Sequence, residues 1–252
     1  MKNYNRLNEE NHNSFGSLMQ IKKYRRNDDI DVYFPEYDYY AINRTYLEFK
    51  KGTIKCPFEP RVCGIGYHGC GPYKIIKQDE KQIIWNNMIS RCYKNNQDKN
   101  KTYQVCTVCE DWHNFQNFAQ WYEDNYYEIP GEKMFLDKDI LIKGNKEYSP
   151  ETCIFVPRKI NNLFTLRQNK RTNLPLGVKN AGSANKTNPY IASITKDNKK
   201  ITIGYFKTID EAFNAYKQEK EDYIKAVAEE YSLYIPDVLY NALINWEIEI
   251  ND

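Results

Sequence analysis

The sequence predicts an α+β protein built from several modules, and three observations lead to this class. Short β-prone runs bounded by turn residues occupy the amino-terminal quarter and residues 174–207, whereas helical periodicity dominates the centre and residues 208–231. The chain of 252 residues is longer than a typical single domain. Aromatic residues make up 15% of it, which is enough to build packed cores rather than a disordered chain.

The first predicted module covers residues 15–63 and is rich in β-structure. Its runs LMQIKKYRR, DIDVYFPEY and TYLEFKKGTIKCP contain alternating, β-branched and aromatic residues, with the turn-prone NDD and KKG among them. These runs predict the strands of a small, partly open barrel. The basic side chains of Lys22, Lys23, Arg25 and Arg26 either contact nucleic acid or form a solvated strand face, and the second alternative is favoured.

The second predicted module, residues 79–166, begins with two helices. In DEKQIIWNNMISRCY (79–93) and EDWHNFQNFAQWYEDN (110–125), apolar residues recur at three- and four-residue steps, so each helix should bury one face. His113 lies off the second apolar stripe, on the exposed side, where it is available for chemistry. Cys106 and Cys109 form a CxxC pair, but no second pair completes a tetrahedral zinc site, so buried thiols are favoured there.

The same module ends in a predicted ββα unit. MFLDKDILIKG and TCIFVP read as two strands joined by the turn residues of GNKEYSPE, and RKINNLFTLR continues as a helix. We expect Asp137 and Asp139 on one face of the first strand, where two carboxylates suit Mg²⁺ or another divalent metal. The alternative is that Lys138 and Asp139 are solvated hairpin residues, while apolar neighbours such as Ile140 and Phe155 form the core.

The near-neutral net charge of the chain conceals a strong segregation of charge. Residues 156–207 carry eleven basic residues against one acidic residue, a balance of +10, and residues 208–252 carry eleven acidic residues against three lysines, a balance of −8. The basic residues are Arg158, Lys159, Arg167, Lys170, Arg171, Lys179, Lys186, Lys196, Lys199, Lys200 and Lys207. A concentrated basic segment is typical of proteins that bind a phosphate backbone, although solvated basic surfaces are also common.

The third predicted module, residues 174–231, combines three strands with one helix. LPLGVKNAG, NPYIASITKD and NKKITIGYFKT are bounded by turn residues, and the helix starts after Thr208, which is a good N-cap. Residues 232–252 follow as an acidic tail with a short helix from Pro236. Its apolar residues Leu239, Leu243 and Trp246 should dock this tail on the preceding module.

An ordered series of motifs runs through residues 85–162. They are W-x-x-M-x-x-R-C-Y at 85–93, V-C-x-x-W at 108–112, F-x-x-F at 115–118, L-D-x-D at 136–139 and Y-S-P-E-x-C at 148–153. In this order they resemble the phage-encoded HNH-type endonuclease family, with its divergent ββα-metal core. The resemblance covers roughly a third of the chain.

This resemblance implies a catalytic site at the hairpin, with two departures from the family's pattern. It places Asp137 at the metal-site carboxylate, and it makes Asp137, Asp139 and His113 the catalytic candidates, with Asp137 and Asp139 as metal ligands. Lys138 stands where an active site of this family has its general-base histidine, and Thr152 stands where it has the asparagine that orients this base. Lysine is a base only if its pKa is strongly lowered, and threonine lacks the two hydrogen-bonding ends of an amide.

A second resemblance covers residues 174–230. The motifs G-V at 177–178, Y-x-A-x-I at 190–194, I-G-Y-F at 203–206 and E-A-x-x-A-Y at 211–216 are similar to the Apetala-2/ERF-type DNA-binding domain. That family inserts the exposed face of its sheet into the major groove of DNA. The DNA-binding candidates that this implies are Lys179, Ser193, Thr195, Lys196, Lys199, Lys200 and Thr202. Most of the family's arginines and its tryptophan are missing here, so we expect phosphate contacts with modest sequence preference.

Together the two resemblances predict a phage-type DNA-binding protein of the HNH homing-endonuclease class, with double-stranded DNA as its partner. Either it retains metal-dependent cleavage, or it is a catalytically inactive regulatory, host-takeover or virion-associated protein on the same scaffold. The sequence has no apolar run of membrane-spanning length and no apolar segment near residue 1, so no membrane partner and no secretion are expected. The expected location is the cytoplasm of an infected bacterium.

Overall fold

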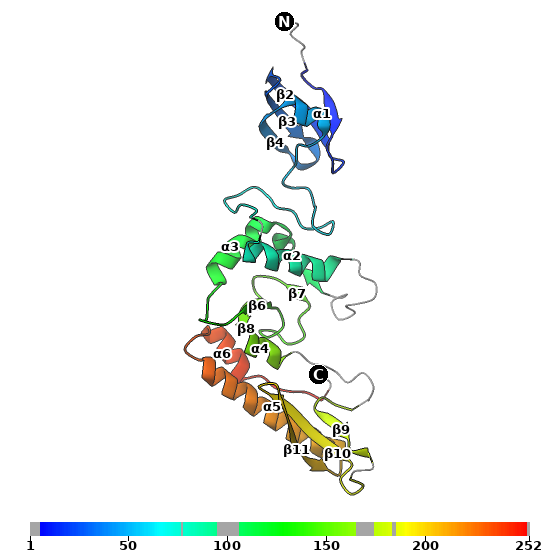
Figure 1. The fold of residues 1–252 in the computed structure, drawn as a ribbon, viewed down its shortest axis with the longest axis vertical. Coiled ribbons are helices and arrows are strands. Elements are labelled where there is room, and N and C mark those ends of the chain that lie inside the picture. Colours follow the sequence, from blue (N-terminus) through cyan, green and yellow to red (C-terminus); the bar gives the residue numbers. More distant parts are fainter. Residues whose placement is uncertain (1–5, 77, 95–105, 165–173, 183–184, 251–252) are drawn as a thin grey trace. The chain divides into compact units, whose positions relative to one another are not determined.

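The computed structural model describes residues 6–76, 78–94, 106–164, 174–182 and 185–250, which form two compact units (Figure 1). Unit 1 comprises Met1–Asp124 and Glu147–Ser149, and unit 2 comprises Asn125–Lys146 and Pro150–Asp252. Helices and antiparallel sheets occur in separate regions, so the predicted α+β class is confirmed. The predicted boundaries 15–63, 79–166, 174–231 and 232–252 divide the chain differently, since the two helical segments predicted at 79–93 and 110–125 lie almost wholly in unit 1, whereas most of the predicted ββα unit lies in unit 2.

Unit 1 begins with a four-stranded antiparallel sheet. The strands β1 (Glu10–His12), β2 (Leu18–Arg26), β3 (Asp29–Phe34) and β4 (Tyr39–Arg44) lie in sequence order, with the 3₁₀ turn η1 (Pro35–Tyr37) before β4. One sheet face and Phe49 of helix α1 (Tyr46–Lys51) enclose a core that includes Met19, Ile21, Val32 and Phe34. The alternation read from the sequence therefore does mark a buried face.

The expectation of an extended run at 45–57 is wrong, because this segment begins with α1. Thr45 and Glu48 form a capping box in which the Thr45 Oγ1 accepts from the Glu48 N–H at 3.1 Å and Glu48 Oε2 accepts from the Thr45 N–H at 2.8 Å. Gly52, with φ of +62°, ends the helix in the left-handed conformation that glycine adopts without strain.

The second part of unit 1 packs two aromatic helices together. They are α2 (Glu80–Tyr93) and α3 (Phe115–Asn125), and the two-residue strands β5 (Thr107–Val108) and β7 (Glu147–Tyr148) pair in parallel. The indole N–H of Trp85 donates to the Trp112 carbonyl at 2.7 Å, and both rings are fully buried. The predicted helix over 110–125 is divided, because residues 110–113 form the 3₁₀ turn η3 (Glu110–His113) and Asn114 is extended.

Unit 2 contains the ββα arrangement and a second sheet. Strands β6 (Met134–Asp137) and β8 (Ile154–Pro157) are antiparallel, and helix α4 (Arg158–Leu163) follows directly. The sheet has the order β11 (Lys199–Phe206), β10 (Tyr190–Lys196), β9 (Val178–Asn180), and helix α5 (Ile209–Tyr231) covers one of its faces (Figure 1). The three antiparallel strands on one helix match the predicted carboxyl-terminal module.

The acidic tail of unit 2 docks on α5. Helix α6 (Asp237–Ile244) buries Leu239 and Leu243 completely, and the Trp246 ring lies 4.4 Å from that of Phe164 between centroids. Further on, the Ile248 N–H donates to Glu221 Oε1 at 2.8 Å. Among the described helices of the whole chain, none combines the length and apolar character needed to cross a membrane.

Candidate nucleic-acid interface

The sheet of unit 2 has an outer face that is turned away from α5. Ala192 and Ile194 of β10 are buried, and successive side chains of a strand alternate between faces, so Ser193 and Thr195 point outward, although Ser193 is itself only 8% exposed. The register pairs Ser193 with Thr202 and Thr195 with Lys200. Five of the predicted DNA-binding residues therefore share this outer face, namely Lys179, Ser193, Thr195, Lys200 and Thr202.

Two other predicted DNA-binding residues lie elsewhere on the sheet. Lys196 is on the α5 side, where its Nζ lies 2.6 Å from Glu219 Oε1 and 5.2 Å from the Tyr223 ring centroid. Lys199 pairs with Lys196 in the register, at the turn between β10 and β11. The ion pair with Glu219 makes Lys196 a weaker candidate for DNA contact than the lysines of the outer face.

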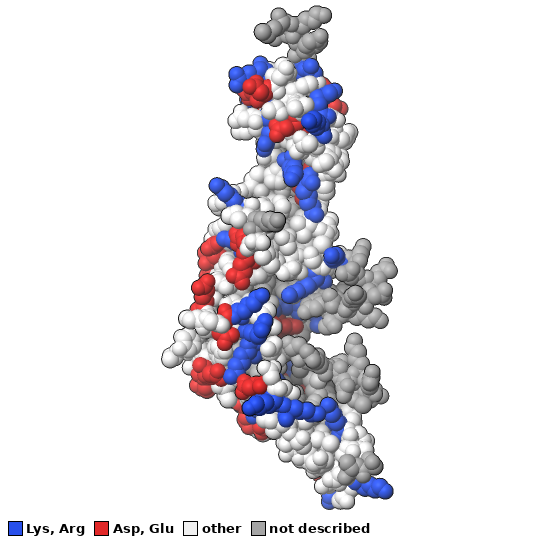
Figure 2. Space-filling view, viewed as in Figure 1, with Lys and Arg blue, Asp and Glu red and all other residues white. Residues whose placement is uncertain are grey.

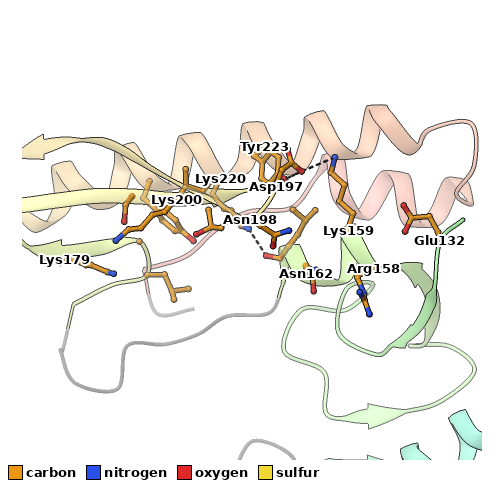
Figure 3. A pocket seen from close by; sticks show the side chains of 17 residues that line it. Glu132, Arg158, Lys159, Asn162, Lys179, Asp197, Asn198, Lys200, Lys220 and Tyr223 are labelled. Atoms are coloured by element: carbon orange, nitrogen blue, oxygen red, sulfur yellow. Dashed lines mark hydrogen bonds and ion pairs between the residues drawn. The ribbon is translucent and has the colours of Figure 1, made fainter.

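Unit 2 also contains a basic pocket, which opens between α4, the sheet and α5 (Figure 3). Its volume of about 790 Å³ falls within the range for small-molecule sites. The cationic side chains in its wall are Arg158, Lys159, Lys179, Lys200 and Lys220. Ser193, Thr195, Asn162 and Asn198 add hydrogen-bonding groups, while Leu163, Leu176 and Ile194 give it an apolar portion. Because Lys179, Ser193, Thr195 and Lys200 belong to both surfaces, the pocket is continuous with the outer face.

Lys220 is the most buried cation of the pocket. Its side chain comes from α5 and is 7% exposed, and its Nζ donates to the Leu163 carbonyl at 2.8 Å. Burial lowers the pKa of Lys220 to about 8, because the charged form loses hydration. An ammonium has three donors, and among the described residues only this carbonyl accepts from it.

Lys179 and Lys200 form a like-charged pair at the pocket rim, on β9 and β11. The adjacent Lys200 side chain lowers the pKa of Lys179, first by direct contact and then by repulsion between the two charges. Among the described residues, no carboxylate lies within 4.0 Å of either ammonium or of the Arg158 guanidinium. Figure 2 shows basic side chains gathered in groups on unit 2, separate from the acidic groups beside them.

Lys159 contrasts with these cations, because acidic residues neutralise it. Its Nζ lies 2.7 Å from Glu230 Oε2 and 3.4 Å from Asp197 Oδ1. The other acidic residue in the pocket wall, Glu132, accepts a hydrogen bond from the Tyr231 hydroxyl at 2.8 Å. The positive potential of the pocket therefore comes mainly from Arg158, Lys179, Lys200 and Lys220.

Sequence reasoning did not identify the pocket, although one signal for it was present. Lys220 falls on the apolar stripe of α5, four residues after Tyr216 and four before Ile224, both of which are buried. A lysine in such a stripe indicates a buried cation. The basic residues Arg167, Lys170 and Arg171, which contributed to the predicted charge of this segment, lie outside the described residues.

The hairpin does not present its two aspartates as expected. Strand β6 ends at Asp137, whose Oδ1 accepts hydrogen bonds from the N–H groups of Asp139 and Ile140, both at 2.9 Å. Asp139 lies in the bend that this cap creates, so placing both carboxylates on one strand face was wrong. Burial, and secondarily the charge of Asp139, raises the pKa of Asp137 to about 6.

Lys138 is buried at 6% exposure, so the expectation that it is a solvated hairpin residue is also wrong. Its Nζ donates to Asp139 Oδ2 at 2.9 Å and to the Asn145 carbonyl at 3.1 Å. Both partners stabilise the charged ammonium, which is unsuited to accept a proton. Thr152, at the position of the family's asparagine, is half-buried beside Cys153, with 4.0 Å between Oγ1 and Sγ.

His113 belongs to unit 1, whereas the two aspartates belong to unit 2. Its Nε2 lies 3.1 Å from the Val108 carbonyl oxygen, which engages this ring nitrogen within unit 1. No group of three or more His, Cys, Asp and Glu side chains in the described part of the chain is arranged to hold a metal. The two hairpin carboxylates do not fit a metal site by themselves, since one caps a turn and the other pairs with Lys138. Metal binding by Asp137 and Asp139 stays a prediction, as does the absence of zinc at Cys106 and Cys109.

Comparison with known proteins gives no match. No model of a known protein family, no curated protein and no solved structure matches the chain.

Proposed function

We propose that the outer face of the unit 2 sheet binds the phosphate backbone of double-stranded DNA, in the manner that the Apetala-2/ERF resemblance implies. The observation that carries this proposal is the adjacency of Lys179 and Lys200, which face the same side without a carboxylate within 4.0 Å among the described residues. Two adjacent ammonium groups repel each other in the free protein, and an anion between them removes this repulsion.

The composition of the outer face favours phosphate contact over base readout. Thr195 and Thr202 are exposed hydroxyl donors that suit phosphate oxygens, whereas Ser193 is buried at 8% exposure, and the five residues of the outer face include no arginine to bind guanine in bidentate fashion. Modest sequence preference and strong salt dependence follow from such contacts.

Electrophoretic mobility shift with a short random-sequence duplex, at low and at physiological salt, tests this function. We expect binding at low salt and about a tenfold loss of affinity in the double variant Lys179→Ala/Lys200→Ala. The matched control is Lys146→Ala/Lys225→Ala, which removes two exposed lysines elsewhere in unit 2 and should bind like the wild type. Absence of any complex at low salt, or equal losses in both double variants, would refute the proposal.

We further propose that the ββα hairpin serves as a scaffold of the HNH class without cleaving DNA, as in a regulatory or virion-associated phage protein. The ion pair between Lys138 and Asp139 supports this choice, because it ties up both the residue at the general-base position and one predicted metal ligand. The test is incubation of supercoiled plasmid with Mg²⁺ or Mn²⁺, comparing the wild type with Asp137→Ala/Asp139→Ala. We expect no nicking by either protein, and nicking by the wild type alone would establish the hairpin as a nuclease site.

A further inference from the structure

The pocket between α4, the sheet and α5 has a buried cation where an apolar side chain would be the ordinary choice. Lys220 occupies a core-facing position of α5, yet among the described residues its ammonium donates to one carbonyl, that of Leu163. A charge that is removed from water and incompletely hydrogen-bonded destabilises the free protein. An anion in the pocket would supply the missing acceptors.

The surroundings of Lys220 specify the chemistry of such an anion. Arg158, Lys179 and Lys200 add three further cations from α4, β9 and β11 to the pocket wall. In Figure 3, Lys179 and Lys200 lie together on one side of Lys220, and Arg158 lies on the other side. Both acidic residues of the wall already have partners. Asp197 pairs with Lys159 and accepts a hydrogen bond from the Tyr223 hydroxyl, and Glu132 accepts one from the Tyr231 hydroxyl. Cations with hydroxyl and amide donors from several elements suit a phosphate group, whose oxygens accept in several directions.

The size of the pocket and its position indicate which phosphate it takes. A volume of about 790 Å³ exceeds what a single phosphate needs and accommodates a sugar with its phosphate. The pocket shares Lys179, Ser193, Thr195 and Lys200 with the outer face, so a strand that crosses this face passes its mouth.

We propose that this pocket binds a backbone phosphate of a polynucleotide at Lys220, its buried donor, while Arg158 on one side and Lys179 and Lys200 on the other contact the neighbouring phosphates. The inference rests on the proposed DNA-binding function and adds to it a defined anchoring site. A free phosphate or a mononucleotide offers the same chemistry, and the arms of the experiment separate these sources.

The first arm uses inorganic phosphate as the probe and the melting temperature as the readout, at constant ionic strength against chloride. We expect phosphate to raise the melting temperature of the wild type and of the control Lys225→Met, which removes an exposed lysine of α5, the helix that also carries Lys220. Lys220→Met should lose this response. Arg158→Gln is a second variant, and since Arg158 is exposed it should keep the fold while weakening the response several-fold. Equal responses in all four proteins would overturn the proposal.

The second arm compares a short DNA duplex with deoxyadenosine 5′-monophosphate, by fluorescence anisotropy and calorimetry. We expect Lys220→Met to weaken duplex binding about tenfold and to lower the slope of log affinity against log salt by about one phosphate contact. If the variant loses phosphate and nucleotide but binds duplex like the wild type, the pocket takes small phosphates and the backbone assignment fails.

The two proposals fail in distinguishable ways. If Lys179→Ala/Lys200→Ala weakens duplex binding and Lys220→Met changes none of the three ligands, the outer face binds DNA and the pocket inference is overturned. If the wild type binds no duplex, the DNA function fails together with the backbone assignment, whatever the response to inorganic phosphate.

Discussion

At the scale of single residues, Lys220 lowers the stability of the free protein, because its charge is buried. Its folded pKa of about 8 lies below the ordinary 10.5, so the unfolded chain binds the proton more tightly. The buried charge therefore lowers the free energy of unfolding by roughly 3 kcal/mol, as the difference between the two pKa values implies. This loss is complete below pH 8 and decreases as the pH rises toward 10.5. A bound anion would offset this cost.

We predict that Lys220→Met is more stable than the wild type at neutral pH without phosphate, by roughly 1 to 2 kcal/mol. The gain from removing the buried charge is reduced because the Leu163 carbonyl loses its donor. Urea unfolding between pH 7 and 10 measures the difference, which should shrink as the pH rises. A variant that is less stable at every pH would show that the lysine is structural.

Asp137 yields a second prediction at this scale, which separates its role as a turn cap from its charge. Asp137→Ala removes the acceptor of two backbone N–H groups and should cost about 1 to 3 kcal/mol. Asp137→Asn keeps an oxygen in that place and removes a poorly hydrated charge, so its stability should equal or exceed that of the wild type. Urea unfolding at neutral pH checks both, and similar losses in the two variants would contradict the capping role.

The hairpin also shows where residue-level reasoning from sequence stops. The alternation of MFLDKDILIKG predicts a strand that continues beyond Asp137, but side-chain capping turns the chain at that residue. Lys138 can be buried because its ammonium donates hydrogen bonds to the neighbouring Asp139 and to the Asn145 carbonyl, seven residues away. Such partners depend on the turn and are not visible in a periodicity.

At the scale of elements, α5 is the helix that positions the sheet and the pocket. Its first turn is fixed by Thr208, whose hydroxyl accepts from the Glu211 N–H at 3.2 Å while Glu211 Oε2 accepts from the Thr208 N–H at 3.2 Å. The sequence predicted the N-cap at Thr208, and the structure adds the reciprocal bond to Glu211. Thr45 and Glu48 have the same spacing, but this signal lies among β-prone residues and α1 was not predicted.

We predict that Thr208→Ala lowers the free energy of unfolding of unit 2 by about 1 kcal/mol, because the first turn of α5 loses its cap. Thr208→Ser keeps the hydroxyl and serves as the matched control, with little change expected. Thermal unfolding followed by circular dichroism measures both variants. Equal melting temperatures for Thr208→Ala and the wild type would mean that tertiary packing alone fixes the start of α5.

A close contact at β9 gives another prediction for an element. Gly177 has φ of +75°, and a Cβ at this position would overlap the Tyr216 ring of α5. Gly177→Ala should therefore displace β9 from the helix and destabilise unit 2 by roughly 2 kcal/mol or more. Gly182→Ala is the control, since its Cβ would meet open space at a similar positive φ of +63°. Similar melting temperatures for the two variants would contradict the close packing of β9 on α5.

At the scale of the whole molecule, local signals and long-range contacts divide what could be predicted. The sheet and helix of residues 178–231 followed from strand alternation, turn residues and an N-cap, all within a short stretch of chain. The pairing of β5 with β7 joins residues 107–108 to 147–148, and the pocket joins α4 to residues of β11 and α5. Neither arrangement leaves a periodic trace in the sequence, so the outer face was predictable and the pocket was not.

Among the described residues, some cations of unit 2 have carboxylate partners and others do not, and this difference predicts how DNA affinity depends on salt. Lys159 and Lys196 are held by carboxylates, whereas Arg158, Lys179, Lys200 and Lys220 are available to phosphates. If these four neutralise one phosphate each, log affinity should fall against log salt with a slope of about −3 to −4. Titration of a duplex at several KCl concentrations measures this slope.

The variants then assign the slope to residues. Lys179→Ala/Lys200→Ala should reduce its magnitude by about two, and Lys146→Ala/Lys225→Ala should leave it unchanged. Lys196→Ala should have a small effect, because that lysine already pairs with Glu219. A slope that survives the loss of Lys179 and Lys200 would place the DNA contacts on another surface, since counterion release follows the cations that touch phosphate.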